Sequence, residues 1–178
     1  EGEDAVEARL TGICFAVEPG RADFVPLTGE GVGELAAFKP LLEDPQILKA
    51  GRRLQRDRTV LAGRADIRLD GLSFDVGIAD YLLNPSGRNR TLAALALDHL
   101  GETLPPPKEA EEKSLLPPPP GEQAEEAGRN AEVIHRLSKT LAAKLKTEGL
   151  ETLFRDVEMP IASILSDMER AGIRIDSE

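Results

Sequence analysis

The sequence of 178 residues predicts an α/β fold in which a mixed sheet is covered by helices. Residues 10–17 and 22–27 are apolar runs separated by turn residues, which predicts an antiparallel hairpin. Segments with the periodicity of strands and helices then alternate as far as residue 100. The apolar content of 40% is sufficient for one sizeable core, so we expect one domain with appended segments.

Composition excludes several classes of function. The formal net charge of −10 argues against a strong DNA clamp, because phosphate binding needs clustered Lys and Arg, so we expect this chain alone to bind DNA weakly. The single cysteine, Cys14, excludes an internal disulfide and a cysteine metal site, which fits a reducing cytoplasm. No run is long and apolar enough to span a membrane, and the acidic beginning of the sequence is unlike a signal peptide.

The stretch around Asp57 is the most informative for function. A short apolar segment ends at Gly51, and Leu54, Asp57 and Leu61 follow at offsets that place them on one helix face. A carboxylate on a buried face requires a metal ion, an arginine or a backbone partner. The alternative is an aspartate in the first helical turn that favours the helix dipole.

The neighbouring segments have clear helix and strand signals. A helical stripe over residues 35–42 is expected to kink or break at Pro40. Residues 67–74 alternate as in a strand, and a helix over 75–83 stops before Pro85. The next helix, 91–100, places His99 near its C-terminal carbonyl groups, an interaction that we favour over metal ligation.

The last third of the sequence begins with a proline-rich connector, residues 102–122, which we interpret as a spacer. A polyproline ligand for an aromatic groove is the alternative. A long helix over 123–148 follows, whose apolar stripe includes Asn130. Residues 150–171 predict a further helix with Pro160 inside it.

Several motifs in this order carry a resemblance to a known family. They are Lys49-x-Gly51-x-x-Leu54-x-x-Asp57, Leu72-x-Phe74-Asp75-x-x-x-Ala79-x-Tyr81-Leu82-Leu83-Asn84-Pro85, and Leu92-x-x-Leu95-Ala96 before Leu100-Gly101. They resemble the 3′-5′ exonuclease domain of bacterial DNA polymerase I, a family A polymerase. Residues 154–176 resemble the start of that enzyme's polymerase domain. The resemblance covers almost the whole chain except the proline-rich part.

The resemblance implies a ribonuclease-H-like (DnaQ-like exonuclease) mixed sheet flanked by helices, with its first strand missing from this chain. It divides the chain into an exonuclease-like domain, residues 1–148, and the start of a polymerase domain, residues 149–178. Because the first strand is normally central, its neighbours are expected to have open edges.

The family hydrolyses phosphodiesters with two divalent cations about 4 Å apart, held by several carboxylates. Its ligands are an Asp-x-Glu pair on the first strand, an Asp on a helix and an Asp four residues after a Tyr on the last helix. Asp57 matches the helix ligand, whereas the Asp-x-Glu pair would lie before residue 1. Alignment on Arg136-Leu137 places Glu126 at the Tyr position and Asn130 at the Asp position. We therefore expect no intact catalytic set, with Asp57 as the only metal ligand and Asn130 and Glu126 as remnants.

Arg53 and Arg56 occupy positions where the family usually has an Asn and an aromatic residue. Guanidinium groups there would repel a metal ion and pair with Asp57 instead, so they are expected to block the site.

Three functions are compatible with these observations. The first is a degenerate exonuclease-like domain of a DNA polymerase I, acting in DNA replication and repair in the bacterial cytoplasm and supporting the polymerase domain that follows it. This fragment then has neither polymerase nor exonuclease activity and needs no cofactor, Mg²⁺ being required by the parent polymerase, which contacts the DNA. The second is an active proofreading exonuclease truncated of its first strand, and the third is a partner-binding module that uses the proline-rich segment.

Overall fold

A computed structural model describes residues 10–27, 32–87, 90–105 and 120–172. The predicted hairpin is confirmed: β1 (Gly12–Glu18) pairs antiparallel with β2 (Arg21–Pro26). The turn places Gly20 at a φ of 75°, a conformation that glycine adopts without steric cost. Phe15 of β1 stacks on Phe38, with ring centroids 5.4 Å apart, which joins the hairpin to the segment after it.

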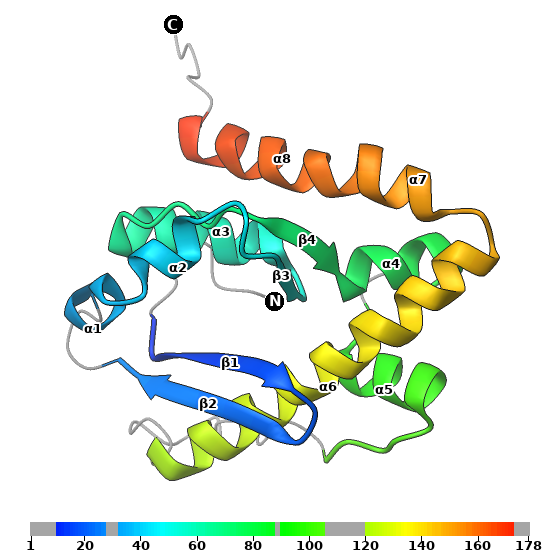
Figure 1. Ribbon diagram of the computed structural model, residues 1–178, viewed down its shortest axis with the longest axis horizontal. Coiled ribbons are helices and arrows are strands. Elements are labelled where there is room, and N and C mark those ends of the chain that lie inside the picture. The colour runs from blue at the N-terminus through cyan, green and yellow to red at the C-terminus, as the bar shows by residue number, and fades with distance from the viewer. Residues whose placement is uncertain (1–9, 28–31, 88–89, 106–119, 173–178) are drawn as a thin grey trace, which may run out of the picture.

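The second pair of strands is parallel. β3 (Lys49–Gly51) pairs with β4 (Leu72–Asp75), and the two pairs form separate two-stranded sheets in the described residues. Strands of both orientations are thus present, as expected for a mixed sheet, but no ladder joins β1 to β3 across the described part of the chain. Figure 1 shows the hairpin below and the β3–β4 pair above it, with α6 crossing beside the hairpin.

The predicted helices are present, and two of them are interrupted. Their bounds are α1 (Val32–Ala36), α2 (Lys39–Glu43), α3 (Leu54–Ala65), α4 (Val76–Leu83), α5 (Leu92–Leu100), α6 (Pro120–Thr147), α7 (Glu151–Leu153), the π-helix η1 (Phe154–Glu158) and α8 (Met159–Ala171). The break predicted at Pro40 is confirmed, since α1 ends at Ala36 and α2 begins at Lys39, whereas no kinked helix forms there. Pro40 lies in the first turn of α2, where its missing N–H has no partner to lose. No helix in the described ranges is sufficiently long and apolar to cross a membrane.

The long helix α6 supplies much of the core. Its fully buried side chains are Val133, Leu137, Leu141 and Leu145, which recur at every fourth residue. The helix packs against the hairpin, β3, α4 and α5. The predicted stripe is therefore correct in its C-terminal half, whereas Asn130 is only partly buried. The proline-rich stretch between residues 106 and 119 lies outside the described residues.

The last helix, α8, lies along α3, whereas η1 contacts α4 and α7 contacts α6 (Figure 1). Pro160 sits in the first turn of α8, directly after the π-helix, in which the N–H of Met159 reaches back five residues to the carbonyl of Phe154. Ser166 is fully buried against α3, and its hydroxyl lies 3.0 Å from that of Thr59. Arg58 donates to the Ser163 carbonyl at 2.6 Å. These bonds make the contact between α3 and α8 polar and specific.

Asp75, at the end of β4, joins three elements. Its buried carboxylate accepts hydrogen bonds from the backbone N–H groups of Gly77 and Ile78 at the start of α4, at 2.8 and 3.3 Å. It also accepts one from Leu54, the first residue of α3, at 2.8 Å. One side chain thus caps two helices and fixes where both begin.

We expect Asp75→Ala to lower the free energy of unfolding by about 3 kcal/mol, because it leaves one buried and two partly buried N–H groups without an acceptor. Urea denaturation measures the change. Asp23→Ala is the control, because that side chain is 65% exposed on β2 and its removal is expected to cost less than about 0.5 kcal/mol. Equal losses in the two variants would contradict the capping role.

Candidate functional site

Asp57 lies in the first turn of α3, as predicted, but not on its buried face. Leu54 and Leu61 are buried, whereas Asp57 is exposed. The prediction that these three side chains share a buried stripe is wrong for the aspartate. α3 is enclosed by the core on one side and by α8 on another, so its buried positions include Arg58 and Thr59 instead.

Although water reaches Asp57, the protein atoms around it remove part of its solvation. This desolvation raises the pKa of the Asp57 carboxyl group to about 7, and the negative charge of Asp75 raises it further. Arg56 and Arg53 lower the pKa, but by less than the first two causes raise it. A carboxyl group with this pKa is partly protonated near neutral pH.

The two arginines lie at the start of α3, Arg53 directly before the helix and Arg56 in its first turn. Arg53 precedes the helix in the left-handed region, with φ 63° and ψ 42°, which is uncommon for a residue with a side chain. Arg53 is exposed and Arg56 half-buried. Arg52, the residue before Arg53, donates a hydrogen bond to the Arg90 carbonyl at 2.7 Å and so connects this turn to the segment before α5. The expected positive charge beside Asp57 is present, and whether it blocks a metal ion stays a prediction.

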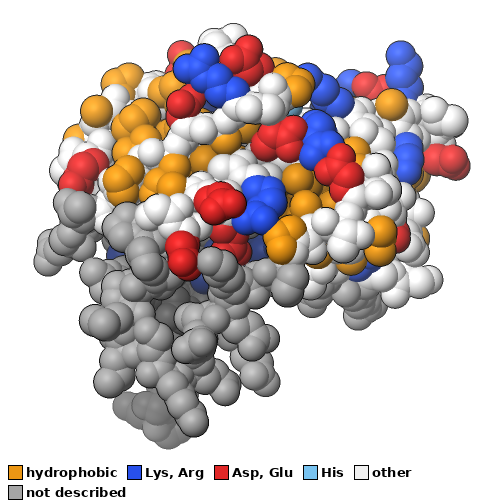
Figure 2. Space-filling view, turned by 90° about the horizontal axis from the view of Figure 1, so that it is seen from below, with side chains coloured by type: hydrophobic (Ala, Val, Ile, Leu, Met, Phe, Trp, Pro, Cys, Tyr) orange, Lys and Arg blue, Asp and Glu red, His pale blue; other side chains and the backbone are white. Residues whose placement is uncertain are grey.

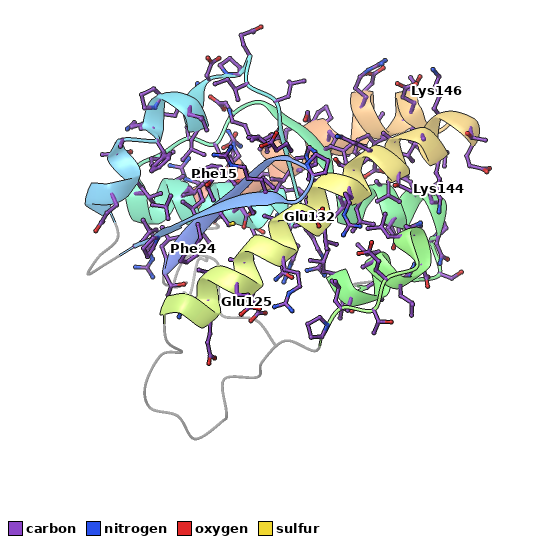
Figure 3. The ribbon with its side chains drawn as sticks, turned by 60° about the horizontal axis from the view of Figure 1, so that its bottom comes forward. Phe15, Phe24, Glu125, Glu132, Lys144 and Lys146 are labelled. Carbon is purple, nitrogen blue, oxygen red and sulfur yellow. The ribbon has the colours of Figure 1, made fainter. Side chains whose placement is uncertain are left out.

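Glu126 and Asn130 lie in the N-terminal half of α6, and both are partly buried. A Cβ added at Gly128 would lie 3.7 Å from the Cβ of Ala22, so this part of α6 packs on the hairpin (Figure 3). Glu126 is not among the charges that shift the pKa of Asp57. The described residues contain no group of three or more His, Cys, Asp or Glu side chains placed to hold a metal ion.

Sequence reasoning missed a second polar cluster, which is centred on Asp80 of α4. Its buried carboxylate accepts from Arg90 at 3.0 Å and lies 2.7 Å from Nε2 of His99. Arg90 also pairs with Asp98 on α5. Nδ1 of His99 lies 2.9 Å from Nζ of Lys144 on α6. The partners of His99 are therefore side chains of two other helices, whereas we predicted the carbonyl groups of its own. Asp80 and His99 are 19 residues apart in the sequence, and His99 and Lys144 are 45 apart. No local sequence pattern therefore indicated this cluster.

One face of the molecule carries interspersed charges of both signs. On the face shown in Figure 2, Lys and Arg lie among Asp and Glu and do not form one basic area. This distribution agrees with the net charge of −10. A surface of this kind does not concentrate the positive potential that DNA backbone binding requires.

Comparison with known proteins identifies the family. A family model described as "DNA polymerase I, ribonuclease H-like domain" matches residues 6–105, more than half of the chain. The chain belongs to this family. The resemblance inferred from the motifs around Asp57 and Asp75 is thereby confirmed, and so is the ribonuclease-H-like fold class.

The chain is similar to several DNA polymerase I proteins of bacteria. It is 34% identical to that of Pseudomonas aeruginosa over 98% of the chain and 21% of the relative. The identity is 32% with that of Chloroflexus aurantiacus, over 97% of the chain and 19% of the relative. The identity with the DNA polymerase I of Bacillus subtilis is 29%, over 98% of the chain and 20% of the relative. The chain thus spans about a fifth of the length of the curated relatives it matches.

Solved structures agree with this family membership. One is the POL domain of Pol1 from M. smegmatis in complex with DNA primer-template and dNTP, with a TM-score of 0.73 and 25% identity, over 88% of this chain and 25% of that one. Brucella melitensis NrnC has a TM-score of 0.76 and 20% identity, over 96% of this chain and 81% of that one. The likeness to NrnC shows a shared fold.

The raised pKa of Asp57 predicts a pH dependence of stability for this member of the family. The folded chain binds more protons than the unfolded chain between pH about 4, the ordinary pKa of an aspartate, and about 7. The free energy of unfolding therefore falls as the pH rises through this window. We expect a contribution of about 1 kcal/mol, because solvent screens the exposed carboxylate.

Asp57→Asn is expected to remove this contribution to the fall in the free energy of unfolding between pH about 4 and about 7. Urea denaturation at several pH values in this range measures the change. Asp23→Asn, an exposed control on β2, should leave it in place. Parallel profiles for the wild type and Asp57→Asn would contradict the raised pKa.

Proposed function

We propose that this chain is the exonuclease-like domain of a bacterial, cytoplasmic DNA polymerase I that acts in DNA replication and repair, and that the domain has lost proofreading. Its role is to support the polymerase domain. The observation that carries this proposal is the surroundings of Asp57, where the charges that act on the carboxylate belong to Asp75, Arg56 and Arg53.

Among the neighbouring charges, that of Asp75 has the largest effect on the pKa of Asp57, and this carboxylate has a structural role. It is buried and already accepts three backbone hydrogen bonds. Moving it to a metal ion would leave the first N–H groups of α3 and α4 without their acceptor. A two-metal site needs several carboxylates that are free to coordinate, and Asp57 alone does not supply them.

The charge balance supports the same conclusion. Arg53 and Arg56 lower the pKa of Asp57 and so favour its ionised form, which is the effect that a bound cation would have. Two guanidinium groups also repel a divalent ion. In this proposal the fragment has no cofactor of its own, and Mg²⁺ is required by the polymerase domain, which binds the DNA.

An active exonuclease is the second candidate. The raised pKa of Asp57 favours it, because catalytic sites gather groups with shifted pKa values and nearby like charges. Asn130 would supply an amide oxygen in this case, and further carboxylates would have to come from residues outside the described ranges. The net charge of −10 argues against it, because it opposes binding of the DNA backbone.

A purified chain incubated with a labelled single-stranded oligodeoxynucleotide and Mg²⁺ or Mn²⁺ tests the proposal. We expect no shortening of the oligonucleotide on a denaturing gel. Asp57→Ala is the matched control, since it removes the remaining ligand candidate. Metal-dependent digestion by the wild type that Asp57→Ala abolishes would refute the loss of proofreading and support the second candidate.

The C-terminal helices support a role in contacting a polymerase domain in cis. They bury Phe154, Met159 and Ala162, yet they also expose an apolar stripe. Each member has another three or four residues away, which places them on one helix face: Leu153, Val157, Ile161, Ile164, Leu165 and Met168. Ile164 is 56% and Met168 62% exposed, and apolar rows of this kind are typical of interaction surfaces. The relatives are about five times as long as this chain, so their remaining length is available to cover the stripe.

In the longer protein, we expect the amide hydrogens of α8 to exchange more slowly than in this chain alone, because a covered helix opens less often. Ile164→Asp should abolish that difference, while Val17→Asp, at a site 75% exposed on β1, should preserve it. Hydrogen exchange monitored by mass spectrometry measures both. Equal exchange of α8 in the two lengths of chain would exclude this contact.

A further inference from the structure

The cluster of Asp80, His99 and Lys144 lies beside a pocket that the exonuclease-like function does not use. The pocket has a volume of about 800 Å³, within the range of small-molecule sites. Its walls are His99 and Lys144 together with Leu82, Leu83, Ala143, Thr147, Glu148 and Leu150. Three helices, α4, α5 and α6, meet there.

The hydrogen bonds assign the proton on His99. Asp80 is buried and ionised when it pairs with Arg90, so it only accepts, and Nε2 of His99 must donate to it at 2.7 Å. Nδ1 is then the unprotonated nitrogen. It accepts from Nζ of Lys144 at 2.9 Å.

The order of groups is thus a carboxylate, a base and a nucleophile, with the base within hydrogen-bond reach of the other two. Asp80 orients the imidazole and stabilises its charged form, although Arg90 offsets part of that effect. His99 is only slightly exposed, with its side chain held from two sides, whereas Lys144 is exposed and open to a reagent in the pocket. A lysine amine beside a positioned base is more nucleophilic than one surrounded by water.

We propose that Lys144 is a modification site that takes acyl groups from small acyl phosphates, with His99 as the general base. The ammonium first loses one proton to water. The Nζ amine then attacks the acyl carbon, Nδ1 of His99 accepts the remaining excess proton, and the bond from carbon to the phosphate oxygen breaks. The products are the amide of Lys144 and inorganic phosphate, and His99 returns its proton to water. The amide no longer carries the lysine's positive charge.

Lys146 provides an internal control. It lies in the last turn of the same helix and is also exposed, but Figure 3 shows it away from Lys144, toward the C-terminal helices. No hydrogen bond or ion pair joins its side chain to other residues of the described ranges. The hydrogen bond to His99 is thus a contact that Lys144 has and Lys146 lacks within the described ranges.

The test is incubation of the full chain with acetyl phosphate in mildly alkaline buffer, followed by peptide mass spectrometry of the acetylated fraction at each lysine over time. We expect Lys144 to react about tenfold faster than Lys146, a small part of what a general base achieves in an enzyme site. In His99→Gln, whose amide can still donate to Asp80, the rate at Lys144 should fall to that of Lys146. Lys144→Arg should leave Lys146 unchanged.

If His99→Gln does not fold, the acetylation rates of Lys144 and Lys146 are compared in the wild type with and without concentrated urea. Unfolding separates Lys144 from His99, so the two lysines should then react at equal rates. If the contact between Lys144 and His99 only fastens α6 to α5, Lys144 will be the slower lysine in the folded chain. That result, or equal rates in the folded wild type, would overturn the proposal.

Discussion

The buried carboxylate of Asp75 is the interaction on which the arrangement of this domain depends. It stands at the end of β4 and accepts backbone hydrogen bonds from the first turns of α3 and α4. A carboxylate satisfies several N–H groups of helix ends at once and interacts favourably with both helix dipoles. The start of α3 is thereby fixed relative to the parallel strands, and with it the position of Asp57 three residues later. The structural role of Asp75 and the chemistry available to Asp57 are thus linked.

Polar contacts, more than apolar ones, determine how the helices lie on this core. The leucines of α6 make the interior, but leucine packing alone tolerates sliding. The hydrogen bond between Thr59 and Ser166 connects α3 to α8. Asp80 of α4 binds Arg90, which precedes α5, and His99 of α5. Buried polar groups have to find their partners, because leaving one without a partner costs about 1–3 kcal/mol. They therefore select one packing of the helices among many that would bury similar area.

The electrostatics around Asp57 are the physical basis of the proposed loss of exonuclease chemistry. Desolvation and the charge of Asp75 disfavour the ionised carboxylate, while Arg53 and Arg56 favour it. In a metal site the cation supplies this compensation. Here the guanidinium groups of Arg53 and Arg56 supply part of the positive charge that stabilises the ionised carboxylate of Asp57. In the proposal, the fold therefore accommodates this aspartate without a bound ion. This is the physical basis of the proposed supporting role for the domain.

The sequence by itself determined the hairpin, the alternation of strands and helices, the family and the helix that carries Asp57, because these follow from local periodicity and from motifs of contiguous residues. Of the two outcomes predicted at Pro40, a kink or a break, the chain shows the break, and Pro160 lies inside the predicted C-terminal helical run. Only the tertiary structure decided that Asp57 faces water, that Asp75 caps two helices and that Asp80, His99 and Lys144 meet. These outcomes depend on which helix faces α8 and on contacts between residues far apart in the chain, which no local pattern encodes.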